Sequence, residues 1–421
     1  MVTEERHRTV REILTEAKDL SELTVDLAYA AVFFDDKEIA EEVLRLEERS
    51  DELISDLWVL SMLAARTVDD ARQLTGVVRV GRAIEKIAGA AVDVARVVLR
   101  DLGLPRELRA DLAHAEEMVA RVRVRAGSAL DGRSLDQASL PTATGMSVIA
   151  IRRGRAWVFG PEDDEIVRDG DVLIVQGPEE GMEILRGMAG FAPGKAGEGV
   201  AGEAQGGVEG SGGFAVGSGF EAGPPPPLSD LDRAVDTIVE MKNVAEVAVG
   251  LAYACLMYGE RSLAAEVEAL EARTDEMRFA LERWVLRAAG GAERPEDLRG
   301  LLYLASASEV IGDAAKQIAF LIEDGEEVHP VLSLAFSQAD EVVVRAEVGT
   351  GARADGVALA ELDVERVTGM YVLAVGRGGR WVYRPRPQMQ LLPGDVVLAT
   401  GPDEGRSAFR MLVRGDGPDE E

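Results

Sequence analysis

Carboxylates spaced four residues apart are the side chains of this sequence that most directly suggest chemistry. Residues with this spacing share one face of a helix, so both acids of a pair point the same way. Facing helices that carry such pairs can bind hard or borderline cations such as magnesium, manganese or iron. The pairs are Glu47 with Asp51, Glu271 with Asp275, and Glu309 with Asp313.

The same spacing has a simpler explanation, which the sequence leaves open. Acids on an exposed helix face are commonly solvated, and Glu47 and Asp51 lie close in sequence to Arg45 and Arg49. Ion pairs with these arginines would neutralise the acids without any metal. A histidine-based metal site or catalytic triad is disfavoured, because the 3 histidines are isolated from one another along the chain.

The elements that must position these acids occur twice. An offset of 224 residues places Leu46-Glu47 on Leu270-Glu271 and Trp157-Val158 on Trp381-Val382, with hardly a gap along the chain. Chance does not give so many matches at one offset, so the chain is an internal tandem duplication. Residues 191–228 separate the copies. They are rich in Gly, Ala and Glu and end in four prolines, a composition typical of a flexible linker with a stiff end.

Each copy begins with a helical region. From about residue 36 to 66, apolar side chains recur at alternating intervals of three and four residues, which predicts a long helix packed along one face. Similar patterns predict helices before it, over about 5–34, and after it, over about 77–98, and all three recur in the second copy. Three long antiparallel helices per copy are typical of a bundle, and the two copies could close one six-helix bundle.

This helical unit resembles the PhoU family. The resemblance rests on the E-x-x-x-D signature, which occurs at 47–51, 271–275 and 309–313. It implies three-helix units that bind a divalent or iron-type metal ion. The implied ligands are Glu47, Asp51 and Glu85 in the first copy and Glu271, Asp275, Glu309 and Asp313 in the second. Gly89 stands where the fourth signature would place an Asp, so the two sites are expected to be unequal.

After the helices the pattern changes to a period of two. Arg121 to Arg125 alternate charged and apolar residues, which predicts a strand with one wet face. A hairpin is expected over 147–159, followed by a strand over 172–175 and a helix from Glu179. The predicted fold class is therefore α+β. The predicted segments are helical domains at 5–118 and 229–342, α/β domains at 119–190 and 343–415, and the linker at 191–228.

The α/β unit resembles the TrkA-C domain, also called RCK_C, of regulators of potassium channels and transporters. The resemblance rests on Gly145 to Gly154 and Gly170 to Glu180, and on their copies. It implies that two such domains pair and hold a small ligand, in some members a cyclic dinucleotide, at their interface. The implied ligand contacts are Ile151, Arg152, Pro161, Val375, Arg377 and Pro385. Alternatively, these residues have ordinary structural roles. The apolar pair would then lie in the core, the arginines in solvent and the prolines at the ends of strands. Helices replace the nucleotide-binding Rossmann domain that usually accompanies TrkA-C.

The composition of the chain limits the classes of partner and binding site that it can have. The net charge of −30 disfavours nucleic acid, whose phosphates repel such a chain. The single cysteine excludes a disulfide within one chain and a cysteine-based zinc site. The longest uncharged runs are about 13 residues, whereas a membrane-spanning helix needs roughly 20. No secretory signal is evident, so a cytoplasmic protein is expected, at the membrane only through a partner.

Three functions remain open. The leading hypothesis is a non-enzymatic regulator of a membrane channel or transporter for potassium or magnesium, with a small ligand sensed by the paired α/β domains. A PhoU-type metal-binding regulator of phosphate uptake is the rival. A metal-dependent enzyme that uses the helix carboxylates is the third, and it would lose turnover on Asp275→Ala and Asp313→Ala. Self-association is expected, with the repeats paired within the chain.

Overall fold

The computed structural model describes residues 8–105, 108, 118–154, 156–191, 229–292, 294–323, 329–378, 380–383 and 385–415. Apart from Phe191, the predicted linker lies outside the described residues, as does the expected start of the first helix near residue 5.

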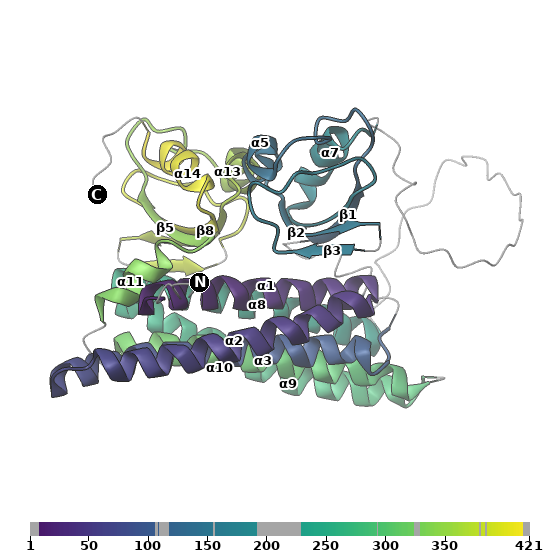
Figure 1. The fold of residues 1–421 in the computed structure, drawn as a ribbon, viewed down its shortest axis with the longest axis horizontal. Helices are drawn as coiled ribbons and strands as arrows, with labels where there is room; N and C mark the ends of the chain where they lie inside the picture. Colours follow the sequence, from purple (N-terminus) through teal and green to yellow (C-terminus); the bar gives the residue numbers. More distant parts are fainter. Residues whose placement is uncertain are drawn as a thin grey trace, which may run out of the picture.

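Six long helices form a bundle in the described part of the chain, and two α/β domains lie side by side on one face of it (Figure 1). In the first copy the helices are α1 (Val10–Phe34), α2 (Lys37–Ala64) and α3 (Val68–Leu99). In the second they are α8 (Asp230–Tyr258), α9 (Arg261–Ala289) and α10 (Arg299–Glu323). Helices α1 and α8 lie directly beneath the sheets, and the other four lie farther away (Figure 1). The predicted six-helix bundle is confirmed.

Local sequence explains where the helices begin. Thr9, Thr67 and Ser229 each cap a helix with a hydroxyl group, and the acid three residues later returns a hydrogen bond to the backbone of the cap. These reciprocal bonds satisfy amide groups that have no partner inside the helix. Asp36 caps α2 by accepting from the N–H groups of Glu38 and Ile39.

The two copies share one hydrophobic core. Helix α3 packs against α10, and buried residues of all six helices belong to a single cluster. Tyr29 of α1 and Ser308 of α10 also join the copies by a buried hydroxyl–hydroxyl hydrogen bond of 3.2 Å. Each three-helix unit therefore depends on the other to cover its apolar face.

Each α/β domain contains a four-stranded antiparallel sheet with the same strand order, β1-β4-β2-β3 and β5-β8-β6-β7. The first sheet comprises β1 (Met118–Arg123), β2 (Ser147–Arg153), β3 (Ala156–Phe159) and β4 (Val172–Gly177). The second comprises β5 (Glu341–Glu347), β6 (Tyr371–Arg377), β7 (Arg380–Tyr383) and β8 (Val396–Pro402). The predicted hairpin at 147–159 is β2–β3.

The predicted alternation of the first strand is confirmed, because Val122 and Val124 are buried whereas Arg123 and Arg125 are exposed, but much of the other sheet face is buried as well. Val122 and Leu173 pack in the core of the α/β domain itself. Val119, Ile149 and Ile174, on the other face, belong to the core of the bundle. Alternating side chains of a strand point to opposite faces. The sheet therefore has a second apolar neighbour, the bundle, which the alternation at residues 121–125 did not reveal.

Shorter helices complete the domains. The predicted helix from Glu179 is α7 (Glu179–Met188), and α14 (Gly405–Arg414) is its copy. Further short helices have too few residues to show periodicity. They are α5 (Leu135–Ala138), α6 (Leu140–Thr144), η1 (Pro295–Leu298), α11 (Pro330–Phe336), α12 (Leu359–Leu362) and α13 (Val364–Thr368).

Candidate functional site

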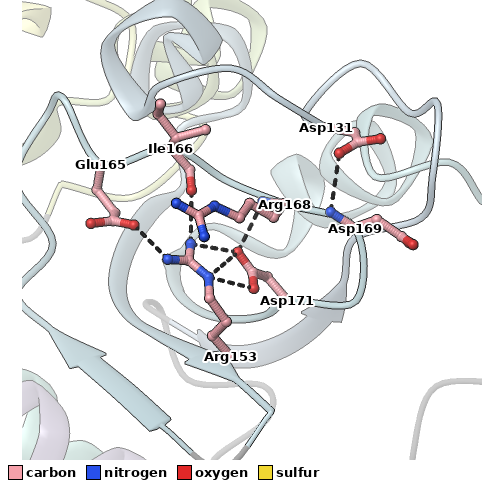
Figure 2. Close-up of polar contacts among 7 residues, drawn as sticks. All are labelled: Asp131, Arg153, Glu165, Ile166, Arg168, Asp169 and Asp171. Carbon is pink, nitrogen blue, oxygen red and sulfur yellow. Dashed lines mark hydrogen bonds and ion pairs between the residues drawn. The ribbon is translucent and has the colours of Figure 1, made fainter.

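A buried aspartate clamps the end of the hairpin in the first α/β domain (Figure 2). Asp171 is 1% exposed and accepts hydrogen bonds from Arg153 Nε and Nη2, at 3.0 and 2.8 Å, and from the N–H of Arg168 at 2.9 Å. Arg153 also binds Glu165 at 3.0 Å and the carbonyl oxygen of Ile166 at 2.7 Å. Such charge-assisted, bidentate bonds give a fixed geometry, so the turn before β4 is held to the end of β2.

The second domain repeats this clamp. Arg377 Nε and Nη2 donate to Asp395 at 2.7 and 2.5 Å, and the N–H of Leu392 donates at 2.8 Å. Burial raises the pKa of Asp395, but the hydrogen bonds from Arg377 and Leu392 and the Arg377 charge outweigh it, so the pKa lies below its usual value. The signal of this clamp in the sequence is the duplicated Gly-Asp at 170–171 and 394–395, which lies in the segments that carry the TrkA-C resemblance.

The two α/β domains contact each other through α6 and α13. Gly145 follows α6 with a φ of +73°, and a Cβ atom there would lie 2.9 Å from the carbonyl oxygen of Glu365 in the other domain. Gly369 follows α13 with a φ of +72°, and its Cβ would lie 3.1 Å from the carbonyl oxygen of Pro141. Each copy thus presents the same turn to the other, and only glycine permits both the backbone conformation and the close approach.

Equivalent ion pairs fasten each sheet to its own half of the bundle. Arg121 of β1 binds Asp36, the cap of α2, at 2.7 Å. Arg345 of β5 binds Glu260, the cap of α9, at 2.8 Å. These residues correspond exactly by the 224-residue offset.

Tryptophans of the two hairpins make a second set of equivalent links. The indole N–H of Trp157 donates to Glu38 at 2.7 Å, and that of Trp381 donates to the hydroxyl of Ser262 at 3.1 Å. The α/β pair is therefore tied at matching points to the starts of α2 and α9.

The carboxylates of the first copy lie on the facing helices α2 and α3. Burial raises the pKa of Glu47, and the negative charges of Asp51 and Glu85 raise it further, whereas the charge of Arg96 lowers it. Burial and the charge of Asp51 likewise raise the pKa of Glu85, and the charge of Arg82 lowers it. The structure thus brings these three acids close enough to repel one another, which is the condition that a bound cation would relieve.

The carboxylates of the second copy already have cations among them. Arg278 Nε lies 2.8 Å from Glu309, and Lys316 Nζ lies 2.9 Å from Glu271. Burial and the charges of Asp275 and Asp313 raise the pKa of Glu309, whereas the charge of Arg278 lowers it. The first copy has apolar Ile54 and Val92 at the positions of these two basic residues.

Models of two families match the chain, each of them twice. The PhoU domain model matches residues 14–98 and 238–322, and the TrkA-C domain model matches residues 119–187 and 343–414. The chain holds two PhoU domains and two TrkA-C domains. Both are regulatory domain families, and their combination supports a regulatory role tied to ion transport.

Three solved structures give a distant likeness. The crystal structure of PhoU from Pseudomonas aeruginosa is 13% identical over 74% of this chain and 93% of that chain, with a TM-score of 0.37. The GsuK RCK domain is 14% identical over 71% of this chain and 63% of that chain, with a TM-score of 0.17. The GsuK channel bound to NAD is 14% identical over 82% of this chain and 66% of that chain, with a TM-score of 0.18. The chain thus spans slightly less than two thirds of these GsuK chains.

The predicted ligand residues of the TrkA-C domains occupy different environments. Ile151 and Val375 are fully buried in the cores of their own domains. Pro161 and Pro385 are half-buried after β3 and β7. Ligand contact by any of these residues stays a prediction.

The two predicted arginines are not equivalent. Arg152 is exposed, with its guanidinium carbon 5.8 Å from the centre of the Trp157 ring. Arg377 binds Asp395 in the clamp, and its counterpart in the first copy is Arg153, which is not among the predicted ligand contacts. A ligand that recruited Arg377 would therefore have to share it with Asp395.

The predicted metal ligands also stay a prediction. Among the residues that the structure describes, no group of three or more His, Cys, Asp or Glu side chains is arranged to hold a metal ion. The acids of the first PhoU domain remain the better candidates, because basic residues occupy the second cluster. In the described ranges, no helix combines the length and the apolar character needed to cross a bilayer.

Proposed function

We propose that this chain is a non-enzymatic regulatory subunit of a membrane channel or transporter for potassium or magnesium. It acts in the cytoplasm and reaches the membrane only through that partner. Its paired TrkA-C domains sense a small ligand, such as a cyclic dinucleotide. The observation that supports this most is architectural: two TrkA-C domains pair within one chain, and each is ion-paired to one half of a shared PhoU bundle.

The contacts suggest how a signal would pass. A ligand that prefers one arrangement of α6 against α13 shifts the pair toward that arrangement by its difference in affinity. Coupling of this kind is typically about 1–3 kcal/mol. Arg121 and Arg345 hold the sheets to the caps of α2 and α9, so the shift would reach the bundle at two equivalent points.

A capture experiment tests the proposal. The full chain is immobilised and incubated with solubilised native membranes, and bound membrane proteins are identified by mass spectrometry. We expect a cation channel or transporter, with recovery altered by the cyclic dinucleotide that raises the melting temperature of the chain. Arg121→Ala with Arg345→Ala should abolish the effect of the ligand on recovery. Arg123→Ala, an exposed arginine on the same strand, is the control. Recovery of no membrane protein would contradict the proposal.

A PhoU-type regulator of phosphate transport is the second candidate. Its support is the first carboxylate cluster, where Glu47, Asp51 and Glu85 repel one another and the basic residues of the second cluster are replaced by apolar ones. It predicts a bound divalent or iron-type metal and capture of a phosphate transporter in the same experiment. Elemental analysis of the purified chain, with Glu47→Gln as the comparison, tests the metal.

A further inference from the structure

Helix α1 of the first copy holds the segment that leads into β5 of the second copy. Asp19 Oδ1 accepts a hydrogen bond from the backbone N–H of Asp340 at 3.0 Å. Lys18 Nζ donates to the carbonyl oxygen of Glu341 at 2.8 Å and lies 5.2 Å from the centre of the Tyr253 ring of α8. Helix α11, which precedes this segment, packs against α1 as well (Figure 1). The first PhoU domain is therefore fastened directly to the start of the second TrkA-C domain.

Three carboxylates lie close to one lysine at this contact. Asp19 and Glu22 belong to α1, and Asp340 directly precedes β5. Lys18 binds Glu22 at 2.5 Å, and the charges of Asp19 and Glu341 act on it too. The lysine is thus shared, and the hydrogen-bond donor of Asp19 is the N–H of Asp340.

Burial and the neighbouring acids favour the neutral form of Asp19. Burial and the charges of Asp340 and Glu22 raise its pKa to about 7, although the charge of Lys18 and the N–H of Asp340 act in the opposite direction. Burial and the charge of Asp163, in the first TrkA-C domain, raise the pKa of Asp340, which the charge of Lys18 lowers. Ionising Asp19 is therefore easier once the contact opens and water reaches the carboxylate.

The second copy lacks the ionisable group at this position. Asn243 stands where the 224-residue offset places the counterpart of Asp19. The neighbouring lysine–glutamate pair is kept, with Lys242 bound to Glu246 at 2.5 Å. The fold therefore accepts a neutral amide between this pair, and the packing of the helix does not require the carboxyl group of Asp19.

We propose that Asp19 makes the contact between α1 and the second TrkA-C domain sensitive to pH, closed while its carboxyl group is protonated and loosened when that group ionises. A protonated carboxyl group still accepts a hydrogen bond from the N–H of Asp340. An ionised one lies beside the charges of Asp340 and Glu22, and it regains hydration when the segment moves away. The pH thus acts on the attachment of this domain independently of any ligand or membrane partner.

The closed contact binds the proton of Asp19 more tightly than the open one, in which the carboxyl group regains its ordinary pKa of 3.8. The equilibrium constant for opening therefore rises with pH up to about 7 and levels off above it. Between pH 6 and pH 8, these two pKa values correspond to an increase of about tenfold.

Hydrogen exchange of the full chain, resolved to single residues, tests the proposal. The amide of Asp340 reports opening directly, because its N–H binds Asp19. We expect its protection factor, which corrects for the intrinsic effect of pH on exchange, to fall about tenfold from pH 6 to pH 8. The amide of Val348, bound to the carbonyl oxygen of Asp395 in the same domain at 2.8 Å, should keep its protection and is the internal reference.

Two variants assign the effect to Asp19. Asp19→Asn cannot ionise, so the protection of the Asp340 amide should no longer depend on pH, whereas Asp236→Asn, the same change at an exposed position of α8, should keep the wild-type response. A pH response that survives Asp19→Asn, or an equal fall at Val348, would overturn the proposal. Should Asp19→Asn fail to fold, carbon-13 NMR of the aspartate carboxyl groups in the wild type still decides, and the absence of any that titrates between pH 6 and pH 8 would refute it.

Discussion

Buried charged residues of this molecule differ in whether hydrogen bonds and opposite charges offset the cost of removing them from water. Asp171 is buried with three hydrogen-bond donors from Arg153 and Arg168, and its charge is satisfied. Asp19 is largely buried beside Asp340 and Glu22, with Lys18 as a nearby cation, and its charge is incompletely compensated. The same residue type therefore contributes to stability with opposite sign at the two places.

The first prediction at this scale concerns the clamp. Asp171→Asn removes the charge that Arg153 binds and should lower the free energy of unfolding by about 2–4 kcal/mol, because a buried ion pair loses one partner. Asp169→Asn, two residues away and exposed, should change it by less than about 0.5 kcal/mol. Chemical denaturation measures both. Equal effects would mean that the clamp does not stabilise the domain.

The second prediction concerns pH. Burial raises the pKa of Asp19 to about 7, and the charges of Asp340 and Glu22 act in the same direction against Lys18. A carboxyl group whose folded pKa is raised binds its proton more tightly in the folded chain. Stability from this group is therefore fully present below pH 3.8, its ordinary pKa, and is lost as pH rises through about 7.

The variant Asp19→Asn tests this pH dependence. It keeps an oxygen for the N–H of Asp340 but cannot ionise. It should melt above the wild type at pH 8, with a difference that shrinks as the pH falls toward 4. Melting curves across this range measure the difference, and a difference independent of pH would rule out titration of Asp19.

Short elements rather than long ones join the TrkA-C domains. Helices α6 and α13 have 5 residues each and form the contact between the domains. Gly145 and Gly369, at their ends, let the two backbones approach. The long strands, by contrast, face their own helices on one side and the bundle on the other. Pairing therefore depends on two turns and is the contact most open to adjustment by a ligand.

A glycine substitution tests this pairing. Gly145→Ala should separate α6 from α13, because its Cβ would lie 2.9 Å from the carbonyl oxygen of Glu365. Hydrogen exchange of residues 364–368, in the opposite domain, should then quicken. Gly154→Ala is the matched control, since Gly154 also has a positive φ, +63°, but has open space around it. Quickening in both variants would indicate backbone strain rather than loss of pairing.

The whole molecule behaves as one unit made of two incomplete halves. The bundle core includes residues of all six long helices and of both sheets. Ion pairs and tryptophan contacts at equivalent positions attach each sheet to the bundle. Cutting the chain between the copies would leave the contact of α3 with α10 as the main connection within the bundle.

We expect that residues 1–190, expressed alone, do not remain a stable monomer. Their α3 face would be exposed, and large exposed apolar patches drive association. The fragment should form a homodimer, or a heterodimer when residues 229–421 are added, as measured by size-exclusion chromatography with light scattering. A monomeric fragment with the melting temperature of the full chain would contradict this.

Sequence alone was sufficient for the duplication, the helical bundle and the fold of the α/β units. Periodicity and repeated motifs are local properties, so they can be recognised in one dimension. The sequence also showed the carboxylate pairs, because residues four apart on a helix share a face.

Only the tertiary structure decided which of these residues meet. Arg278 and Lys316 follow Asp275 and Asp313 by three residues and so share their helix faces. That they bind Glu309 and Glu271, each on the facing helix, was decided by packing. Arg377 was selected by resemblance, yet its partner Asp395 lies on another segment of the sheet and occupies its guanidinium group. A cavity between α1 and α8 draws its walls from all four domains. Contacts between distant segments depend on how whole elements pack, and no local pattern in the chain encodes that packing.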